Sequence, residues 1–164
     1  MTDIDDEISP AAMHSSLNIN WYDRDSIATH NAITHLCISS QDPLPENFEA
    51  TFQINACDQL AYCMIGLNDK PGVVTGQSYL GENFGVLGFC FSNVSGFEKN
   101  WVWHNTQNKV GDIIKLVKND KEIDIFTNDV NVQHLTIKND YPELYLACGL
   151  YGNTSIEILQ ITAN

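Results

Sequence analysis

Short extended segments follow one another from residue 110 to residue 161, and no apolar stripe at helical spacing interrupts them. Two apolar runs rich in β-branched and aromatic residues close this region, at 144–151 and 155–161. The Gly-Asn-Thr sequence at 152–154 lies between them. Because glycine and asparagine favour turns, the pattern predicts two strands joined by a turn. A chain of this kind forms antiparallel sheets and places its functional residues on the loops.

Strand patterns also occur upstream of this region. Residues 48–54 alternate apolar and polar side chains, which indicates a half-buried strand, and residues 60–67 are apolar on both faces, which indicates a central strand. Further strands are expected at 85–91, 101–104, 112–118, 122–126 and 132–138. Strands that recur roughly every ten residues, with glycine, asparagine and aspartate between them, predict an all-β chain, an antiparallel β-sandwich of two packed sheets.

The chain divides into a tail and one domain. Residues 1–16 are acidic and small, and we expect a mobile N-terminal tail there. Residues 17–164 keep a globular composition without an internal repeat, so they predict a single domain.

Net charge limits the partners of this domain. There are 21 acidic and 8 basic residues, the formal net charge is −13, and Arg24 is the sole arginine. Such a surface disfavours nucleic acid and anionic membranes, and it favours basic or neutral partners. The sequence shows no secretory signal and no membrane span, and its five cysteines include no Cys-x-x-Cys pair. We therefore expect buried, reduced thiols and a cytoplasmic location.

One pair of residues resembles a catalytic centre. Glu122 and Asp124 are two apart on a predicted strand, so both carboxylates point to the same face and could act as a glycosidase pair. The strand resembles the Glu-x-Asp-x-x-Glu signature of laminarinase-type endoglucanases, but Thr127 occupies the position of the final acid. A solvated strand face is the favoured interpretation. Since no metal-ligand spacing, phosphate loop or cofactor motif occurs, we expect a non-catalytic protein without metal or cofactor.

Aromatic residues offer a second kind of candidate site. Trp101 and Trp103 share one face of a predicted strand, and Phe97 precedes them. Paired indole rings can stack on sugars or hold a peptide, although burial of at least one of them in the core is the alternative. Trp21 and Tyr22 are expected to close the core.

Several segments together match the motifs of one known domain family. Residues 110–114 are similar to the family's V-G-D-x-I motif, and residues 126–129 are similar to its F-x-N-G turn, with Asp129 in place of glycine. Residues 141–150 resemble the L-Y-P-x-V-x-L strand, and Ser-Ile-Glu-Ile at 155–158 resembles the final S-V-E-I-N-F strand. Upstream segments at 45–52 and 65–67 occupy the positions of the Y-W-E-V and I-G-V-A strands. Together these segments resemble SPRY domains.

The SPRY resemblance implies two antiparallel sheets packed face to face and a non-catalytic module that binds a protein or peptide through loops. It also implies an adaptor or a subunit of a larger complex. We expect contacts from the loops at 69–76, 92–101 and 128–131. The candidate binding residues are Asp69, Lys70, Phe97, Trp101, Trp103, Asn128 and Asp129.

Two alternatives stay open at this point. The first is a carbohydrate-binding or carbohydrate-cleaving sandwich, in which Trp101 and Trp103 stack on the sugar and Glu122 and Asp124 supply the acids. The second is a structural subunit of a larger assembly.

Overall fold

The computed structural model describes residues 16–58, 61–75, 87–90, 93–96, 109–137 and 139–164, with no side-chain description for 87–90 and 93–96. All of the secondary structure in these ranges is β, which confirms the all-β prediction, and no helix there could cross a membrane. The strands are β2 (Ile27–Ser39), β3 (Phe48–Cys57), β4 (Tyr62–Asn68), β5 (Val73–Thr75), β6 (Leu87–Cys90), β7 (Asn93–Gly96), β8 (Ile113–Asn119), β9 (Glu122–Thr127), β10 (Val130–Thr136) and β11 (Tyr145–Ala163).

β11 is the strand on which both layers of the sandwich are built. Along one edge, the first part of β11 pairs with β4 and its second part pairs with β3. Along the opposite edge, β11 pairs with β2, and this pairing continues past the point where β4 gives way to β3. The two ends of β11 approach the same loop: Leu44 N donates to Leu144 O (2.7 Å), and Asn164 N donates to Asn47 O (3.0 Å). The strand therefore bends back on itself and passes from one layer to the other.

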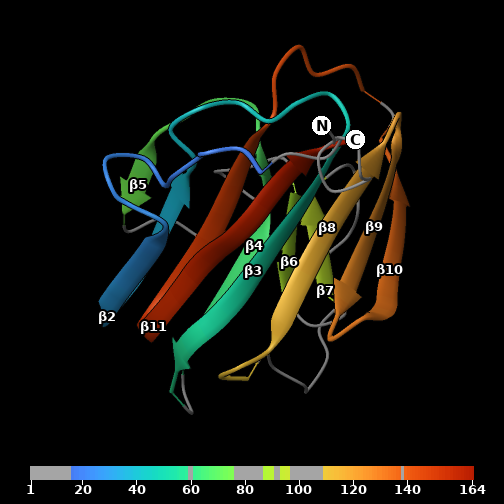
Figure 1. Ribbon diagram of the computed structural model, residues 1–164. Helices are drawn as coiled ribbons and strands as arrows, with labels where there is room; N and C mark the ends of the chain where they lie inside the picture. Colours follow the sequence, from blue (N-terminus) through green and yellow to red (C-terminus); the bar gives the residue numbers. More distant parts are fainter. Residues whose placement is uncertain (1–15, 59–60, 76–86, 91–92, 97–108, 138) are drawn as a thin grey trace, which may run out of the picture.

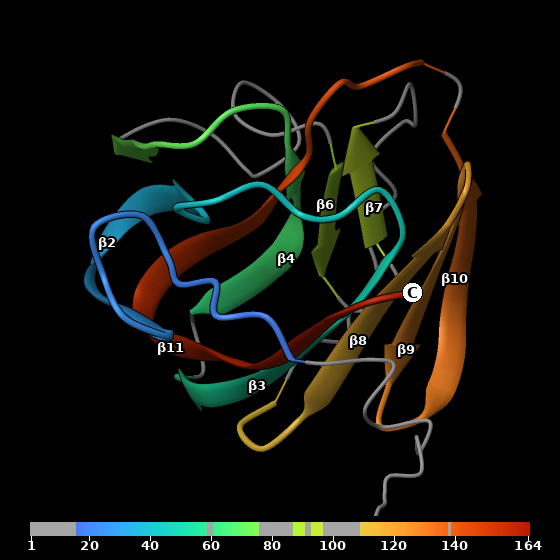
Figure 2. The same ribbon diagram turned by 45° about the horizontal axis from the view of Figure 1, so that its top comes forward.

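The bend produces two layers that are joined as one antiparallel sheet. β3, β8, β9 and β10 continue from the second part of β11, whereas β4, β6 and β7 continue from the first part, with β5 beyond β2. Both views show β8, β9 and β10 side by side toward the right of the molecule, whereas β4 lies nearer its middle (Figures 1 and 2). A sandwich corner formed by a bent strand is a known way to connect packed sheets.

Alternating side chains of these strands fill the space between the layers. Phe48, Phe52 and Ile54 of β3 are fully buried and belong to one hydrophobic cluster together with Ile65 of β4. Trp21 packs on Phe52 with ring centroids 6.2 Å apart, which confirms that Trp21 closes the core. Each such side chain contributes about 1.5–3 kcal/mol by leaving water.

The prediction of a turn at 152–154 is wrong, because β11 runs through this segment without forming a hairpin. Gly152 has a φ of +80°, and the register of β11 against β2 shifts between Tyr151 and Gly152. A Cβ atom at this position would lie 2.9 Å from the Cβ of Ala61. Glycine is therefore required for a bulge at which the strand bends, and not for a loop.

β2 was not expected as a strand of 13 residues. Its middle, at 31–34, is exposed on both faces and includes Ala32 and Ile33, so it lacks the alternation that marks a half-buried strand. This part of β2 passes around the bend, where β11 supplies the hydrogen-bonding partners.

The strands expected at 48–54, 60–67, 112–118, 122–126 and 132–138 correspond to β3, β4, β8, β9 and β10. The strand expected at 101–104 lies outside the described residues, as does the predicted tail except for Ser16, which forms a bridge with Thr162.

Candidate functional site

Loops gather at two opposite ends of the sandwich. At one end, the loop at 40–47 leads into β3, and β8 turns into β9 at 120–121; we name this the pocket end. At the other end, β9 turns into β10 at 128–129 and β11 bends at Gly152; we name this the corner end. A rigid scaffold with loops at its ends is the usual arrangement for binding.

The structure separates the residues that the sequence proposed as one binding site. Asp69 and Lys70 follow β4 at the pocket end, and both are exposed. Asn128 and Asp129 form the turn between β9 and β10 at the corner end. The aromatic candidates Phe97, Trp101 and Trp103 lie outside the described residues. The four described candidates therefore do not share one surface.

Asn128 has a structural role in this turn. Asn128 and Asp129 both have positive φ, at 50° and 69°, a conformation that asparagine and aspartate tolerate better than most residues. The Asn128 side chain accepts a hydrogen bond from Ile113 N (2.9 Å) and donates to Asp112 Oδ1 (3.1 Å). These contacts attach the turn to the start of β8.

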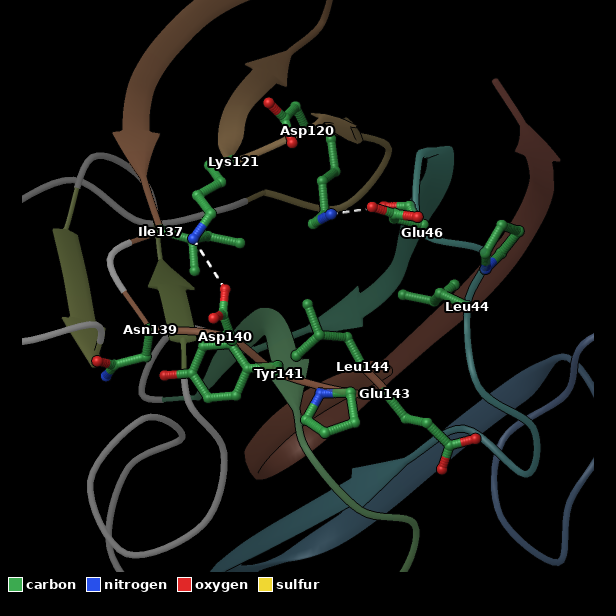
Figure 3. Close-up of a pocket in the computed structure, with 13 residues that line it drawn as sticks. Leu44, Glu46, Asp120, Lys121, Ile137, Asn139, Asp140, Tyr141, Glu143 and Leu144 are labelled. Atoms are coloured by element: carbon green, nitrogen blue, oxygen red, sulfur yellow. Dashed lines mark hydrogen bonds and ion pairs between the residues drawn. The ribbon is translucent and has the colours of Figure 1, made fainter.

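A pocket of about 370 Å³ opens at the pocket end, between three segments that are distant in the sequence (Figure 3). They are the loop before β3, the turn after β8 and the connection from β10 to β11. Its lining residues are Leu44, Pro45, Glu46, Lys118, Asp120, Lys121, Ile137, Asn139, Asp140, Tyr141, Pro142, Glu143 and Leu144.

The lining combines apolar and charged side chains. Leu44, Ile137 and Leu144 are buried and belong to the hydrophobic core, so they give the pocket a fixed apolar base. Four carboxylates and two lysines also line it, which leaves an excess of negative charge. The carboxylates are those of Glu46, Asp120, Asp140 and Glu143.

Both lysines of the pocket already have partners. Lys118 is 8% exposed, and its Nζ donates to the backbone oxygen of Glu46 at 2.5 Å, which holds the loop before β3 against β8. Lys121 Nζ lies 2.8 Å from Asp140 Oδ1 at the surface, and the two side chains point toward each other in Figure 3. This hydrogen bond, with the attraction between the charges, raises the pKa of Lys121 and lowers that of Asp140.

The remaining carboxylates of the pocket are not neutralised in this way. Among the described residues, no lysine, arginine or histidine forms an ion pair with Glu46, Asp120 or Glu143. Glu143 accepts a hydrogen bond from the Tyr145 hydroxyl (3.2 Å), which leaves its charge in place. The pocket can therefore accept a cationic group above an apolar base.

Glu122 and Asp124 do share one face, as their spacing predicted, but both contact His134 on β10. His134 Nε2 lies 2.7 Å from Glu122 Oε1, and Nδ1 lies 2.7 Å from Asp124 Oδ1. Hydrogen bonds to Asp124 and then to Glu122 raise the pKa of His134, and the bond from His134 lowers the pKa of Asp124. The arrangement favours an imidazolium ring between two carboxylates on a partly exposed sheet face.

One other cluster was not anticipated. His35, Tyr62 and Tyr151 lie side by side on β2, β4 and β11, and the rings of Tyr62 and Tyr151 stack at 5.1 Å. They are cross-strand neighbours, which a single sequence does not reveal. No group of histidine, cysteine and acidic side chains suited to a metal ion occurs in the described part of the chain.

The residues of the pocket carried no common signal in the sequence. Lys118, Ile137 and Leu144 lay in expected strands, whereas Pro45 indicated a loop and Asp120 a turn. Nothing in their spacing indicated that these three segments meet. They meet because β3 pairs with β8 and because Leu44 N donates to Leu144 O, and only the structure shows these contacts.

No protein-family model and no curated protein matches the sequence. Solved structures do match the fold. The SPRY domain of human HERC1 matches with a TM-score of 0.66 at 12% identity, covering 90% of this chain and 97% of that one. The NHR domain of Drosophila melanogaster Neuralized matches with a TM-score of 0.61 at 16% identity, covering 90% and 88%.

A lectin-type structure also matches, more distantly. The exoplasmic/lumenal domain of VIP36, with Ca²⁺ and Man3GlcNAc bound, has a TM-score of 0.54 at 8% identity and covers 88% of this chain and 83% of that one. The fold of this protein is therefore a SPRY-like β-sandwich, as the sequence resemblance implied.

Proposed function

We propose that this domain binds a short basic segment of another protein at the pocket end. The observation that carries the proposal is the charge of the pocket, where four carboxylates face two lysines that are already held by Glu46 O and by Asp140. A lysine or arginine of the partner would supply the missing positive charge.

The size and the base of the pocket fit such a side chain. A volume of about 370 Å³ accommodates one long side chain and part of its neighbours. The aliphatic stem of a lysine or arginine would pack on Leu44, Ile137 and Leu144, while its charged group would reach Asp120 or Glu143 at the rim. The net charge of −13 would speed the approach of a basic partner, and salt would weaken this effect.

Similarity of fold agrees with a binding role. The implied activity of SPRY domains is recognition of a protein or peptide without catalysis, and the present fold is SPRY-like. We propose a non-catalytic role here too. Asp124 has a lowered pKa, so it would hold its charge near neutral pH and not act as the proton donor that a glycosidase pair needs.

We also propose that the domain acts in the cytoplasm as an adaptor or as a subunit of a larger complex. Cys37, Cys57, Cys63 and Cys148 are all reduced, and three of them are buried, which agrees with a reducing compartment. Immunoprecipitation from the native source, with and without chemical crosslinking, tests whether the chain is part of a complex.

A selection from a random peptide library, with the whole protein as bait, tests the binding proposal. Selected peptides should be enriched in lysine or arginine next to an apolar residue. The double variant Asp120→Asn/Glu143→Gln should bind them about tenfold more weakly, because two rim charges are lost.

Asp129→Asn is the matched control, since it removes an exposed charge of the same sign at the corner end. Its affinity for the selected peptides should equal that of the unmodified protein. Enrichment of acidic peptides, or equal weakening by the control, would contradict the proposal.

Glycan binding is a second candidate, supported by the similarity to VIP36, whose structure contains Man3GlcNAc. The stacking residues would be Trp101 and Trp103, which lie outside the described residues. A glycan array probed with the protein, with and without calcium, tests this candidate. An array without signal under both conditions would exclude it.

A further inference from the structure

Two cysteines meet at the corner end, and the peptide-binding proposal makes no use of them. Cys57 is the last residue of β3, and Cys63 is the second residue of β4. They pair with Thr154 and Leu150 of β11, on either side of the bend at Gly152. The bend therefore brings the end of β3 close to the start of β4.

Contacts of the two thiols show how close they are. The thiol of Cys63 donates to the backbone oxygen of Ala56, the residue before Cys57, at 3.7 Å. The two cysteine side chains are also hydrogen-bonded to each other. The segment between them turns tightly, with Ala61 N donating to Asp58 O at 2.9 Å. Both thiols are reduced in the structure.

The two thiols differ in access to solvent. Cys57 is half-buried, so a small reagent can reach it, whereas Cys63 is fully buried. The hydrogen bond from the Cys63 side chain lowers the pKa of Cys57 despite its partial burial and the nearby Asp58. Cys37 and Cys148 are buried as well, and burial raises the pKa of Cys37 to about 11 and raises that of Cys148 further.

We propose that Cys57 and Cys63 form a peroxide-sensitive dithiol, in which Cys57 reacts first and Cys63 closes a disulfide. A reactive cysteine of this kind is accessible, has thiolate character and lies next to a second cysteine that resolves the oxidised form. In the described part of the chain, Cys57 is the cysteine that combines these properties, with Cys63 as the second cysteine beside it.

The reaction needs hydrogen peroxide as the oxidant and balances as follows. The Cys57 thiolate attacks one peroxide oxygen, the O–O bond breaks, and Cys57 becomes a sulfenic acid while the other oxygen leaves as water after taking a proton. The Cys63 sulfur then attacks the Cys57 sulfur, the S–S bond forms, the S–O bond breaks, and the hydroxyl leaves as a second water with the proton of Cys63. Two thiols and one peroxide thus give one disulfide and two waters.

Cleavage before aspartate residues makes the test simple, because it places every cysteine in a separate peptide. These peptides are 25–41 with Cys37, 42–57 with Cys57, 58–68 with Cys63, 69–111 with Cys90 and 140–164 with Cys148. The folded protein is treated with hydrogen peroxide, the excess peroxide is removed, and the protein is unfolded in iodoacetamide so that the buried thiols are also blocked. It is then digested and analysed by mass spectrometry without reduction.

We expect peptides 42–57 and 58–68 to be joined by a disulfide and the peptides of Cys37 and Cys148 to remain unoxidised. In the Cys63→Ser variant, the same treatment should leave Cys57 as a sulfenic acid that dimedone traps. Without peroxide, iodoacetamide should label Cys57 at least about 100-fold faster than Cys37, since each unit of pKa changes the thiolate fraction tenfold.

The alkylation rates use the unmodified protein, so they do not depend on the folding of a variant. Equal labelling of Cys57 and Cys37, recovery of Cys57 and Cys63 as thiols after peroxide treatment, or linkage of Cys57 to any cysteine other than Cys63 of the same chain would overturn the proposal.

Discussion

The pocket end and the corner end both consist of turns with exposed polar side chains, but these side chains have different partners. At the corner end, Asp58 accepts a hydrogen bond from Asn153, and Asp112 accepts one from Asn128 and one from Lys109 N. At the pocket end, Glu46 and Asp120 form no ion pair with any described residue. The carboxylates at the corner end thus hold its turns together. At the pocket end Lys121 and Asp140 do the same, whereas the charges of Glu46 and Asp120 remain available to a ligand.

The largest effect is expected from closing the space at the bend. Gly152→Ala should lower the free energy of unfolding by about 3 kcal/mol, because alanine is strained at this positive φ and its Cβ would crowd Ala61. Urea denaturation measures the change.

Gly111→Ala is the matched control, since Gly111 also has a positive φ, of +92°, but open space around it. Gly111→Ala should lower the free energy of unfolding only by the cost of the strained backbone, about 1–2 kcal/mol. If both variants lose the same amount, the close approach to Ala61 does not determine the bend.

Asn128 should matter for stability and not for binding. Asn128→Gly keeps the backbone conformation and removes the hydrogen bonds to Asp112 and Ile113, so we expect a loss of about 1–2 kcal/mol in the free energy of unfolding. The affinity for a basic peptide selected by the protein should not change. A weaker affinity with unchanged stability would restore Asn128 as a binding residue and would contradict the division between the two ends.

The smallest effect concerns His134, and it should depend on pH. Because folding raises the pKa of His134, protonation of this ring stabilises the folded protein. The stabilisation is fully present below the usual pKa of 6.5 and is lost as the pH rises through the pKa in the folded state. The lowered pKa of Asp124 gives stabilisation that is present above 3.8 and is lost as the pH falls through its folded value. His134→Gln should therefore be less stable than the unmodified protein at about pH 5.5 and nearly equal to it at about pH 8.5. If the difference in stability between His134→Gln and the unmodified protein grew with pH, His134 would not form these ion pairs in the folded protein.

Much of the fold was predictable because alternation and apolar runs determine where strands occur. Phe48, Phe52 and Ile54 alternate with polar residues, and they point into the core as expected. The bend at Gly152 was not predictable, since a glycine between two apolar runs fits a turn and a bulge equally well.

The candidate site was less predictable than the fold, for a physical reason. Leu44, Lys118 and Leu144 become neighbours through the pairing of β3 with β8 and the hydrogen bond from Leu44 N to Leu144 O. A single sequence carries no signal for such long-range contacts. The carboxylate pair at Glu122 and Asp124 was recognised from its spacing, but its contact with His134 depends on the register of β10.

Mapping a bound basic peptide by amide chemical-shift perturbation tests the central claim most directly. With a peptide selected by the protein, the account predicts that the largest shifts occur at the pocket end, around Leu44, Ile137 and Leu144. The amides at the corner end, around Asn128 and Gly152, should change little. Shifts concentrated at the corner end, with none around the pocket, would contradict the account.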